Sequence, residues 1–288
     1  MEISPPPAPK PEALAERRFK ILEDIARELS GDVSFPTSFD LAIHLRNVLR
    51  KPDVSLKEVA RVVSVEPLVS TKLLRLANCI ARNPGGQLVV AVDKAVLRLG
   101  LEATRSAAFA VAIEQLRGSR NLSEFNALSS KLWTHTVRTT AAARVVARRM
   151  TRINVDEAMT AGLVHDLGAF YMLYRVAHYE EFHRSPESVE PLVRDWHESI
   201  GESLMYALGL PEPIIAAARD HDQPRDGLVI PKDLRDVVFV SNLLGGPMFE
   251  HGKEPTGELA RPELDDDRYR VLAEEIEAEC QELLGVLS

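Results

Sequence analysis

Apolar residues recur at helical spacing along almost the whole of this 288-residue chain, and the alternation typical of half-buried strands is almost absent. From Glu12 to Leu29, apolar residues return every three or four positions before a Ser-Gly-Asp stop. Ser55, with Glu58 three residues later, predicts a capped helix start. The same periodicity predicts further helices over residues 38–50, 55–63, 67–79, 92–99, 102–117, 124–150, 155–164, 167–182, 188–208, 211–220, 231–245 and 262–286. We therefore expect an all-α, multi-helix bundle.

Proline content and the distribution of histidine suggest how the helices are grouped. The first ten residues contain four prolines, which predicts a disordered or extended lead-in over residues 1–11. All histidines except His44 lie after residue 118. We therefore expect an N-terminal helical subdomain over 12–118 and a histidine-bearing helical subdomain over 119–249. Residues 250–288 then form a polar loop and a last helix.

Charge, cysteine content and hydropathy exclude several classes of protein. The chain has 35 Lys and Arg residues against 43 Asp and Glu residues, and its formal charge of −8 argues against broad attraction to nucleic acid or anionic membranes. Cys79 and Cys280 lack CxxC spacing, which is typical of core or surface thiols in a reducing compartment. The chain shows neither a signal peptide nor an uncharged run of the roughly 20 apolar residues that a spanning helix needs. We expect a cytoplasmic protein with no membrane insertion.

Residues 55–78 raise an alternative, because two short helices separated by a break look like a helix-turn-helix reader of DNA. Ser70, Thr71, Lys72 and Arg75 would then face the bases. Leucine and alanine crowd the second helix on most sides, however, and leave little polar surface for base edges. Contact with nucleic acid is therefore not expected.

Several residues that could ligate a metal ion occur on different predicted helices or at their ends. They are His135, His165, Asp166, His197 and His221. A helical bundle can turn inward-facing side chains from several helices onto one point. His165 and Asp166 are adjacent, so on a regular helix their side chains diverge by about 100°. Both can reach one ion only at a helix end or bend, which the nearby Gly168 makes feasible.

The order of these residues resembles the HD superfamily of metal-dependent phosphohydrolases and, more narrowly, the HDOD family. The resemblance spans roughly residues 34–245. It rests on the segments FPTSFDLAIHLRNVLRKPDVSLKEVARVV, SVEPLVSTKLLRLANC, VDKAVLRLG, LWTHTVRTTAAARVVA, AGLVHDLG and HESIGESLMYALGLPEPIIAAARDHDQP. It implies an HD-like C-terminal part, an additional N-terminal helical subdomain and a role in bacterial signal transduction.

In catalytic HD proteins, the resemblance further implies hydrolysis of phosphate esters by a metal-activated water. His135, His165 and Asp166 would ligate the first ion, and His197 and His221 could hold a second. An aspartate of the last helix would complete the first shell, but Asn242 stands at that position. Asp222 stands where the family often has a second histidine.

A neutral amide is a weaker ligand than a carboxylate. We therefore favour a buried hydrogen-bonded network over metal ligation, with at most one divalent transition-metal ion at low occupancy.

A basic stretch precedes the His-Asp pair. Arg144 and Arg148 lie one helical turn apart and form a stripe. Arginine forks suit phosphate and carboxylate, so the stripe predicts contact with an anion or an acidic partner. Its other interpretation is a solvated face whose charges pair with carboxylates elsewhere in the chain.

Two functions follow from these observations. The first, which we favour, is a non-catalytic regulatory module of the HDOD type that binds a regulatory protein or a small signalling ligand. The second is a metal-dependent phosphohydrolase acting on a nucleotide or a cyclic dinucleotide. The substitution Asn242→Asp distinguishes the two functions, because it should raise metal affinity only if the site is a decayed metal centre.

Overall fold

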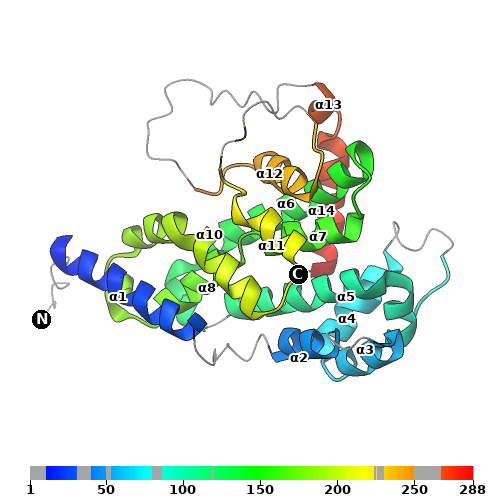
Figure 1. Cartoon of the computed structure of the whole chain (residues 1–288), viewed down its shortest axis with the longest axis horizontal. Coiled ribbons are helices and arrows are strands. Elements are labelled where there is room, and N and C mark those ends of the chain that lie inside the picture. Colours follow the sequence, from blue (N-terminus) through cyan, green and yellow to red (C-terminus); the bar gives the residue numbers. More distant parts are fainter. Residues whose placement is uncertain are drawn as a thin grey trace, which may run out of the picture.

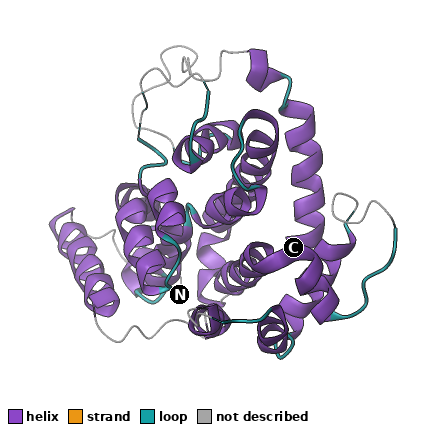
Figure 2. Ribbon diagram, turned by 45° about the vertical axis from the view of Figure 1, so that its right-hand side comes forward, coloured by secondary structure: helices purple, strands orange, loops and turns teal. Residues whose placement is uncertain are grey.

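The computed structural model describes residues 11–30, 40–49, 53–79, 86–118, 120–223, 225, 230–249 and 267–287. Every regular element in these ranges is a helix, and none of the ranges contains a strand (Figure 2). The predicted all-α fold is confirmed. Of the predicted lead-in, only Pro11 is described, and it begins a helix. Within the described ranges, no helix is long and apolar enough to cross a membrane.

Figure 1 labels most of the helices and colours the chain from its N-terminus to its C-terminus. In chain order, the elements are α1 (Pro11–Ser30), α2 (Asp40–Leu49), α3 (Leu56–Val63), α4 (Pro67–Asn78), α5 (Val92–Arg117), the 3₁₀ turn η2 (Arg120–Phe125), α6 (Asn126–Met150), α7 (Val155–Val164), α8 (Leu167–Val176), α9 (Glu180–His183), the 3₁₀ turn η3 (Pro186–Ser188), α10 (Val189–Ala207), α11 (Glu212–Arg219), α12 (Leu234–Gly245), α13 (Asp267–Arg270) and α14 (Ala273–Leu287).

Two local signals in the sequence are confirmed. Ser55 caps α3, because its hydroxyl oxygen accepts a hydrogen bond from the backbone N–H of Glu58 at 3.2 Å. The break between the helices predicted over 92–99 and 102–117 is a kink inside α5, where Gly100 has φ 81° and ψ −178°. Only glycine adopts such a backbone conformation without strain, so α5 changes direction there.

Two predicted helix ends are wrong. The helix predicted over 167–182 stops at Val176, and Tyr179 adopts an extended conformation before α9 begins. This conformation allows the Tyr179 hydroxyl to donate to Asp24 of α1 at 2.8 Å, a tertiary contact that periodicity does not reveal. The helix predicted over 262–286 is interrupted, since α14 begins at Ala273 after the short α13; residues 262–266 lie outside the described ranges.

Helix α6 is the central element of the later part of the chain. It packs against α7, α12 and α14, while α10 packs against α8 and α11. The middle of α6 carries Ala141, Ala142 and Ala143, all fully buried, and such small side chains allow neighbouring helices to approach closely. The inward side of α6 is thereby surrounded by other helices, which removes its polar residues from solvent.

Helix α5 connects the earlier helices with the later ones. It packs against α2, α3 and α4 and also against α7 and α8. Helix α1 lies against α8 and α10 (Figure 1). Glu28 of α1 accepts a hydrogen bond from the Tyr171 hydroxyl and pairs with Arg175, each at 2.8 Å.

Candidate metal centre

The structure brings the five predicted ligand residues together inside the later helices. They come from α6, the α7–α8 junction, α10 and the turn after α11. None of their side chains is more than 5% exposed. We call this group the histidine–aspartate cluster: His135, His165, Asp166, His197 and His221.

His165 and Asp166 lie at the junction between α7 and α8. Helix α7 ends at Val164, and Asp166 has φ −98° and ψ 18°, so the chain turns between the two helices. Asp166 occupies the N-cap position of α8, yet its side chain makes no capping hydrogen bond. Its carboxylate points into the cluster instead. His165 and Asp166 therefore lie at a helix end, where two adjacent side chains can reach the same point.

Gly168 serves packing, which differs from the role that the sequence suggested. A Cβ atom on Gly168 would lie 2.0 Å from the carbonyl oxygen of His197 and 2.5 Å from the backbone nitrogen of Gly201. Helices α8 and α10 therefore touch backbone to backbone. This close approach brings the ring of His197 to Asp166.

Asp166 divides the cluster into two halves. Its Oδ2 atom lies 3.3 Å from Nε2 of His165 and 3.7 Å from Nε2 of His135. Its Oδ1 atom lies 3.3 Å from Nε2 of His221 and 3.5 Å from Nε2 of His197. We call His135, His165 and Asp166 the first half, and Asp166, His197 and His221 the second half. The paired ring nitrogens are 3.2 Å apart in the first half and 3.3 Å apart in the second.

Backbone carbonyl groups fix the rings of three histidines. Their Nδ1 atoms lie 2.8 Å from the oxygen of Gly162 for His165, 2.9 Å from that of Arg194 for His197, and 2.7 Å from that of Ala218 for His221. Since a carbonyl only accepts, each Nδ1 carries a proton, and each ring turns its Nε2 atom toward Asp166. Metal-binding histidines in proteins are oriented in this way.

The donor atoms of the cluster fit a cation. Asp166 is 1% exposed, and its two carboxylate oxygens face four imidazole nitrogens at 3.3 to 3.7 Å. A buried carboxylate needs a positive charge nearby to offset the cost of removing it from water. Imidazole nitrogen and carboxylate oxygen are ligands of divalent transition metals, and in each half three such atoms lie within 4.8 Å of one another. A bound ion therefore suits these residues.

Asn242 and Asp222 complete the surroundings of the cluster. Nδ2 of Asn242 donates to Oδ1 of Asp222 at 2.8 Å and to the backbone oxygen of His221 at 3.2 Å. The Asn242 side chain also lies beside His135. Asp222, which the sequence did not suggest as a ligand, places Oδ2 3.4 Å from Nε2 of His197. The sequence signal that could have identified Asp222 as a ligand is its position directly after His221.

The two halves differ in protonation. Burial lowers the pKa of His135 to about 4, and the charge of Asp166 offsets this only in part. Burial also opposes the charged form of His221, but its contacts with Asp166 and Asp222 outweigh burial and raise its pKa to about 10. Burial likewise opposes ionisation of Asp166, yet the neighbouring His165 and His221 hold its pKa well below the usual value. Positive charge therefore concentrates in the second half.

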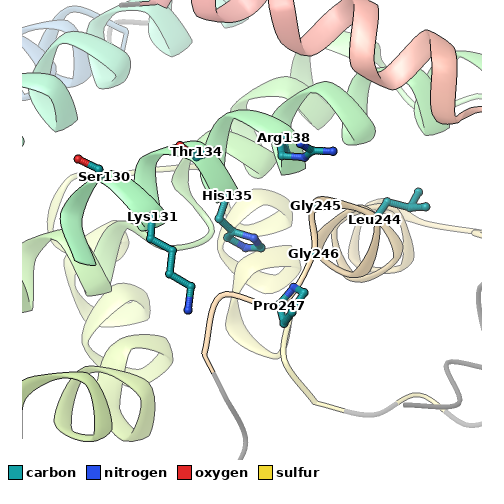
Figure 3. A pocket seen from close by; sticks show the side chains of 9 residues that line it. All are labelled: Ser130, Lys131, Thr134, His135, Arg138, Leu244, Gly245, Gly246 and Pro247. Atoms are coloured by element: carbon teal, nitrogen blue, oxygen red, sulfur yellow. The ribbon is translucent and has the colours of Figure 1, made fainter. Parts of the chain in front are cut away.

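A pocket of about 540 Å³ opens beside the first half. Figure 3 shows Lys131, His135 and Arg138 of α6 on one side and the segment from Gly245 to Pro247 on the other. The other residues that line it are Ser130, Thr134 and Leu244. His135 is the member of the cluster that reaches this pocket.

The arginine stripe faces helix α14 of the same chain. Arg144 is 3% exposed and pairs with Glu279. Arg148 donates to Glu275 at 2.8 Å and to Glu279 at 3.0 Å. The acidic partner of the stripe is thus internal in this structure, and an external anion would have to displace α14.

The polar residues of the helix-turn-helix alternative are also used inside the fold. The hydroxyl groups of Ser70 and Thr71 donate to nearby backbone carbonyls at 3.1 and 2.8 Å. Lys72 is 6% exposed and pairs with Glu114 at 3.0 Å. These contacts use part of the polar surface that a reader of DNA bases would need.

Three solved structures share this fold. A proposed metal-dependent phosphohydrolase from Shewanella amazonensis SB2B has a TM-score of 0.66 and 23% identity, covering 92% of this chain and 99% of that one. An HDOD domain protein of unknown function from Geobacter sulfurreducens has a TM-score of 0.55 and 20% identity, covering 95% and 96%. A proposed signal transduction protein from Marinobacter aquaeolei VT8 has a TM-score of 0.53 and 18% identity, covering 93% and 66%. At these sequence identities, the similarity to the three structures shows a shared fold alone.

Sequence comparison gives the family. An uncharacterised protein from Treponema pallidum (strain Nichols) is 24% identical over 216 residues, which are 70% of this chain and 40% of that protein. The chain therefore spans about two fifths of the length of this relative. The sequence model of the HDOD domain matches residues 35–224, which is more than half of the chain. The resemblance expected from the sequence is thus confirmed: the chain belongs to the HDOD domain family.

Proposed function

We propose that this chain is a non-catalytic regulatory module of the HDOD type whose histidine–aspartate cluster binds one divalent transition-metal ion. The ion is the small ligand to which the module responds, and a regulatory protein is its partner. The buried carboxylate of Asp166 carries the proposal, because its two oxygens face four imidazole rings at 3.3 to 3.7 Å. A cation between these groups offsets the cost of burying the charge.

Two features favour binding without hydrolysis. Asn242 contributes no negative charge to the first half, which is the half beside the pocket. The histidines of the second half, His197 and His221, are 2% and 1% exposed. A catalytic ion keeps a coordination position that the substrate can reach, whereas a structural or regulatory ion is enclosed. The surroundings of this cluster are typical of an enclosed ion.

The position of the cluster would allow a bound ion to affect the packing of several helices. Its residues come from α6, the α7–α8 junction, α10 and the turn after α11, so an ion bound to Asp166 and to neighbouring rings would hold together helices that are far apart in sequence. A ligand that binds only the folded arrangement stabilises it in proportion to its concentration. Loss of the ion would loosen these helices and change the surface that a partner protein contacts.

Metal analysis tests this proposal. The chain is purified without a histidine tag or chelator, and transition metal per chain is measured by plasma mass spectrometry beside the His165→Ala/Asp166→Ala variant. We expect close to one ion per chain, absent from the double variant, and no turnover of phosphomonoesters or phosphodiesters. Background metal in both proteins would refute the proposal.

The pocket beside His135 favours a second candidate function, a metal-dependent phosphohydrolase. Lys131 and Arg138 line this pocket and could attract a phosphate group, and Arg138 lies 3.5 Å from Glu277. A bound ion would supply Lewis-acid chemistry next to it. Turnover of a phosphodiester that a chelator abolishes, and that Lys131→Ala slows more than the exposed control Lys94→Ala, would establish this function.

We further propose a cytoplasmic location and the division into subdomains after residue 118. Neither Cys79 nor Cys280 forms a disulfide among the described residues, which is consistent with a reducing compartment. Limited proteolysis would test the division, which predicts a first cut near residue 118.

A further inference from the structure

We propose that the ion binds in the second half of the cluster and that Asp222 is its fourth ligand, beside Asp166, His197 and His221. This inference rests on the proposed function, which requires only that the cluster binds an ion. It assigns the ion to one side of Asp166 and adds a ligand from the residues of this chain.

The donor atoms of Asp166, His197 and His221 lie within 4.8 Å of one another, and Asp222 lies next to both ring nitrogens. Nε2 of His197 lies 3.5 Å from Oδ1 of Asp166 and 3.4 Å from Oδ2 of Asp222. Nε2 of His221 lies 3.3 Å from Oδ1 of Asp166 and 3.8 Å from Oδ1 of Asp222. Two imidazole nitrogens and two carboxylates make a four-ligand set that suits ions such as Zn²⁺ and Co²⁺.

The charges of the two halves are unequal. The second half has two carboxylates, Asp166 and Asp222, whose charges together balance a divalent ion. The first half has only its share of Asp166, because the side chain that closes it is the neutral Asn242. In a buried site the attraction between opposite charges is strong and little screened. A single ion is therefore held more tightly in the second half.

Asn242 acts as a positioning residue for Asp222. Its Nδ2 donates to Oδ1 of Asp222 at 2.8 Å, which leaves Oδ2 directed at His197. The backbone N–H of Asp222 donates to Glu198 at 3.2 Å and fixes the other end of the residue. A carboxylate at position 242 would instead repel Asp222. The amide at this position thus supports the ligand of the second half.

The exposure of Asp222 gives an ion a way in. Its side chain is 27% exposed, whereas Asp166 is 1% exposed. An ion arriving from solvent therefore meets Asp222 before the histidines behind it.

Cobalt titration of the full chain tests the assignment. Co²⁺ is added to metal-free protein, and its affinity and visible absorption are measured for wild type, Asp222→Asn and the matched first-half variant His135→Gln. We expect Asp222→Asn to weaken Co²⁺ binding by ~10-fold or more and to change the absorption spectrum. We expect His135→Gln to stay within about threefold of wild type. Thermal unfolding of the metal-free variants verifies that each one is folded.

The possible outcomes separate the inference from the proposed function. Wild-type protein that binds no Co²⁺ would refute the proposed function and, with it, the inference. Binding that survives Asp222→Asn, or that His135→Gln weakens equally or more, would place the ion elsewhere in the cluster. The inference would then be wrong, while the proposed function would stand.

Discussion

At the scale of single residues, protons and a metal ion compete for the same nitrogen atoms around Asp166. His221 illustrates this, because its Nε2 faces Asp166 and its raised pKa makes the ring positively charged at neutral pH. A proton on that ring compensates the buried carboxylate when an ion does not. The cluster is therefore stable in two forms, and pH should shift the balance between them.

The first prediction concerns the stability of the metal-free chain. The pKa of His221 is about 10 in the folded chain, against about 6.5 in an unfolded one. A raised pKa stabilises the folded state fully below about pH 6.5, and this contribution is lost as pH rises through about 10. We expect the melting temperature of chelator-treated protein to fall between these values. The His221→Gln variant should show a shallower fall, and an identical slope in both would contradict this account.

The second prediction concerns the charge of the first half. Asn242→Asp places a second carboxylate next to Asp222, where the amide now donates at 2.8 Å. The metal-free variant should be less stable, because like charges repel in a buried site. With Co²⁺ it should bind two ions per chain, since each half then has a carboxylate of its own. Asn126→Asp, at the exposed start of α6, adds the same charge far from the cluster and should leave one ion per chain. Unchanged stoichiometry in Asn242→Asp would show that charge does not limit the first half.

At the scale of elements, the packing of α8 against α10 sets the geometry of the cluster. The sequence could predict both helices, because each has its own apolar periodicity. It could not predict where α8 ends, since the extended Tyr179 depends on Asp24 of α1, 155 positions away. Nor could it assign Gly168 its packing role, because the contact involves His197 on another helix. Local sequence patterns predict which segments are helices. Where a helix ends and how closely two helices pack depend on contacts between residues that are distant in sequence.

The third prediction tests that spacing. Gly168→Ala would place a Cβ atom 2.0 Å from the backbone oxygen of His197, so α8 and α10 must separate. We expect a loss of about 1–3 kcal/mol in unfolding free energy, together with weaker Co²⁺ binding as His197 moves from Asp166. Gly285→Ala is the matched control, because nothing lies within 4 Å of its Cβ position on α14. That variant should be neutral, or stabilised by up to ~1 kcal/mol. Urea unfolding of both variants measures the difference, and equal effects would contradict the close-contact account.

At the scale of the whole molecule, α14 joins parts of the chain that are far apart in sequence. It packs against α6 and also against α4 and α5 (Figure 1). Lys72 of α4 donates to the backbone oxygen of Leu287, near the end of α14. The sequence indicated that Arg144 and Arg148 would meet acidic groups, but it could not show that these belong to the last helix. Glu279 is 135 positions from Arg144, a separation across which residue patterns predict no pairing.

The fourth prediction concerns this connection. Glu279→Ala leaves the guanidinium of Arg144 buried without its main partner, which should cost about 3–5 kcal/mol of unfolding free energy. Glu277→Ala is the control on the same helix. Its partner Arg138 lies 3.5 Å away with a side chain that is 45% exposed, so its loss should cost ~1 kcal/mol or less. Hydrogen exchange should become faster in α4 and α5 as well as in α6 of Glu279→Ala, because α14 contacts all three helices. Faster exchange in α6 alone would show that α14 is a local cover and does not connect the two groups of helices.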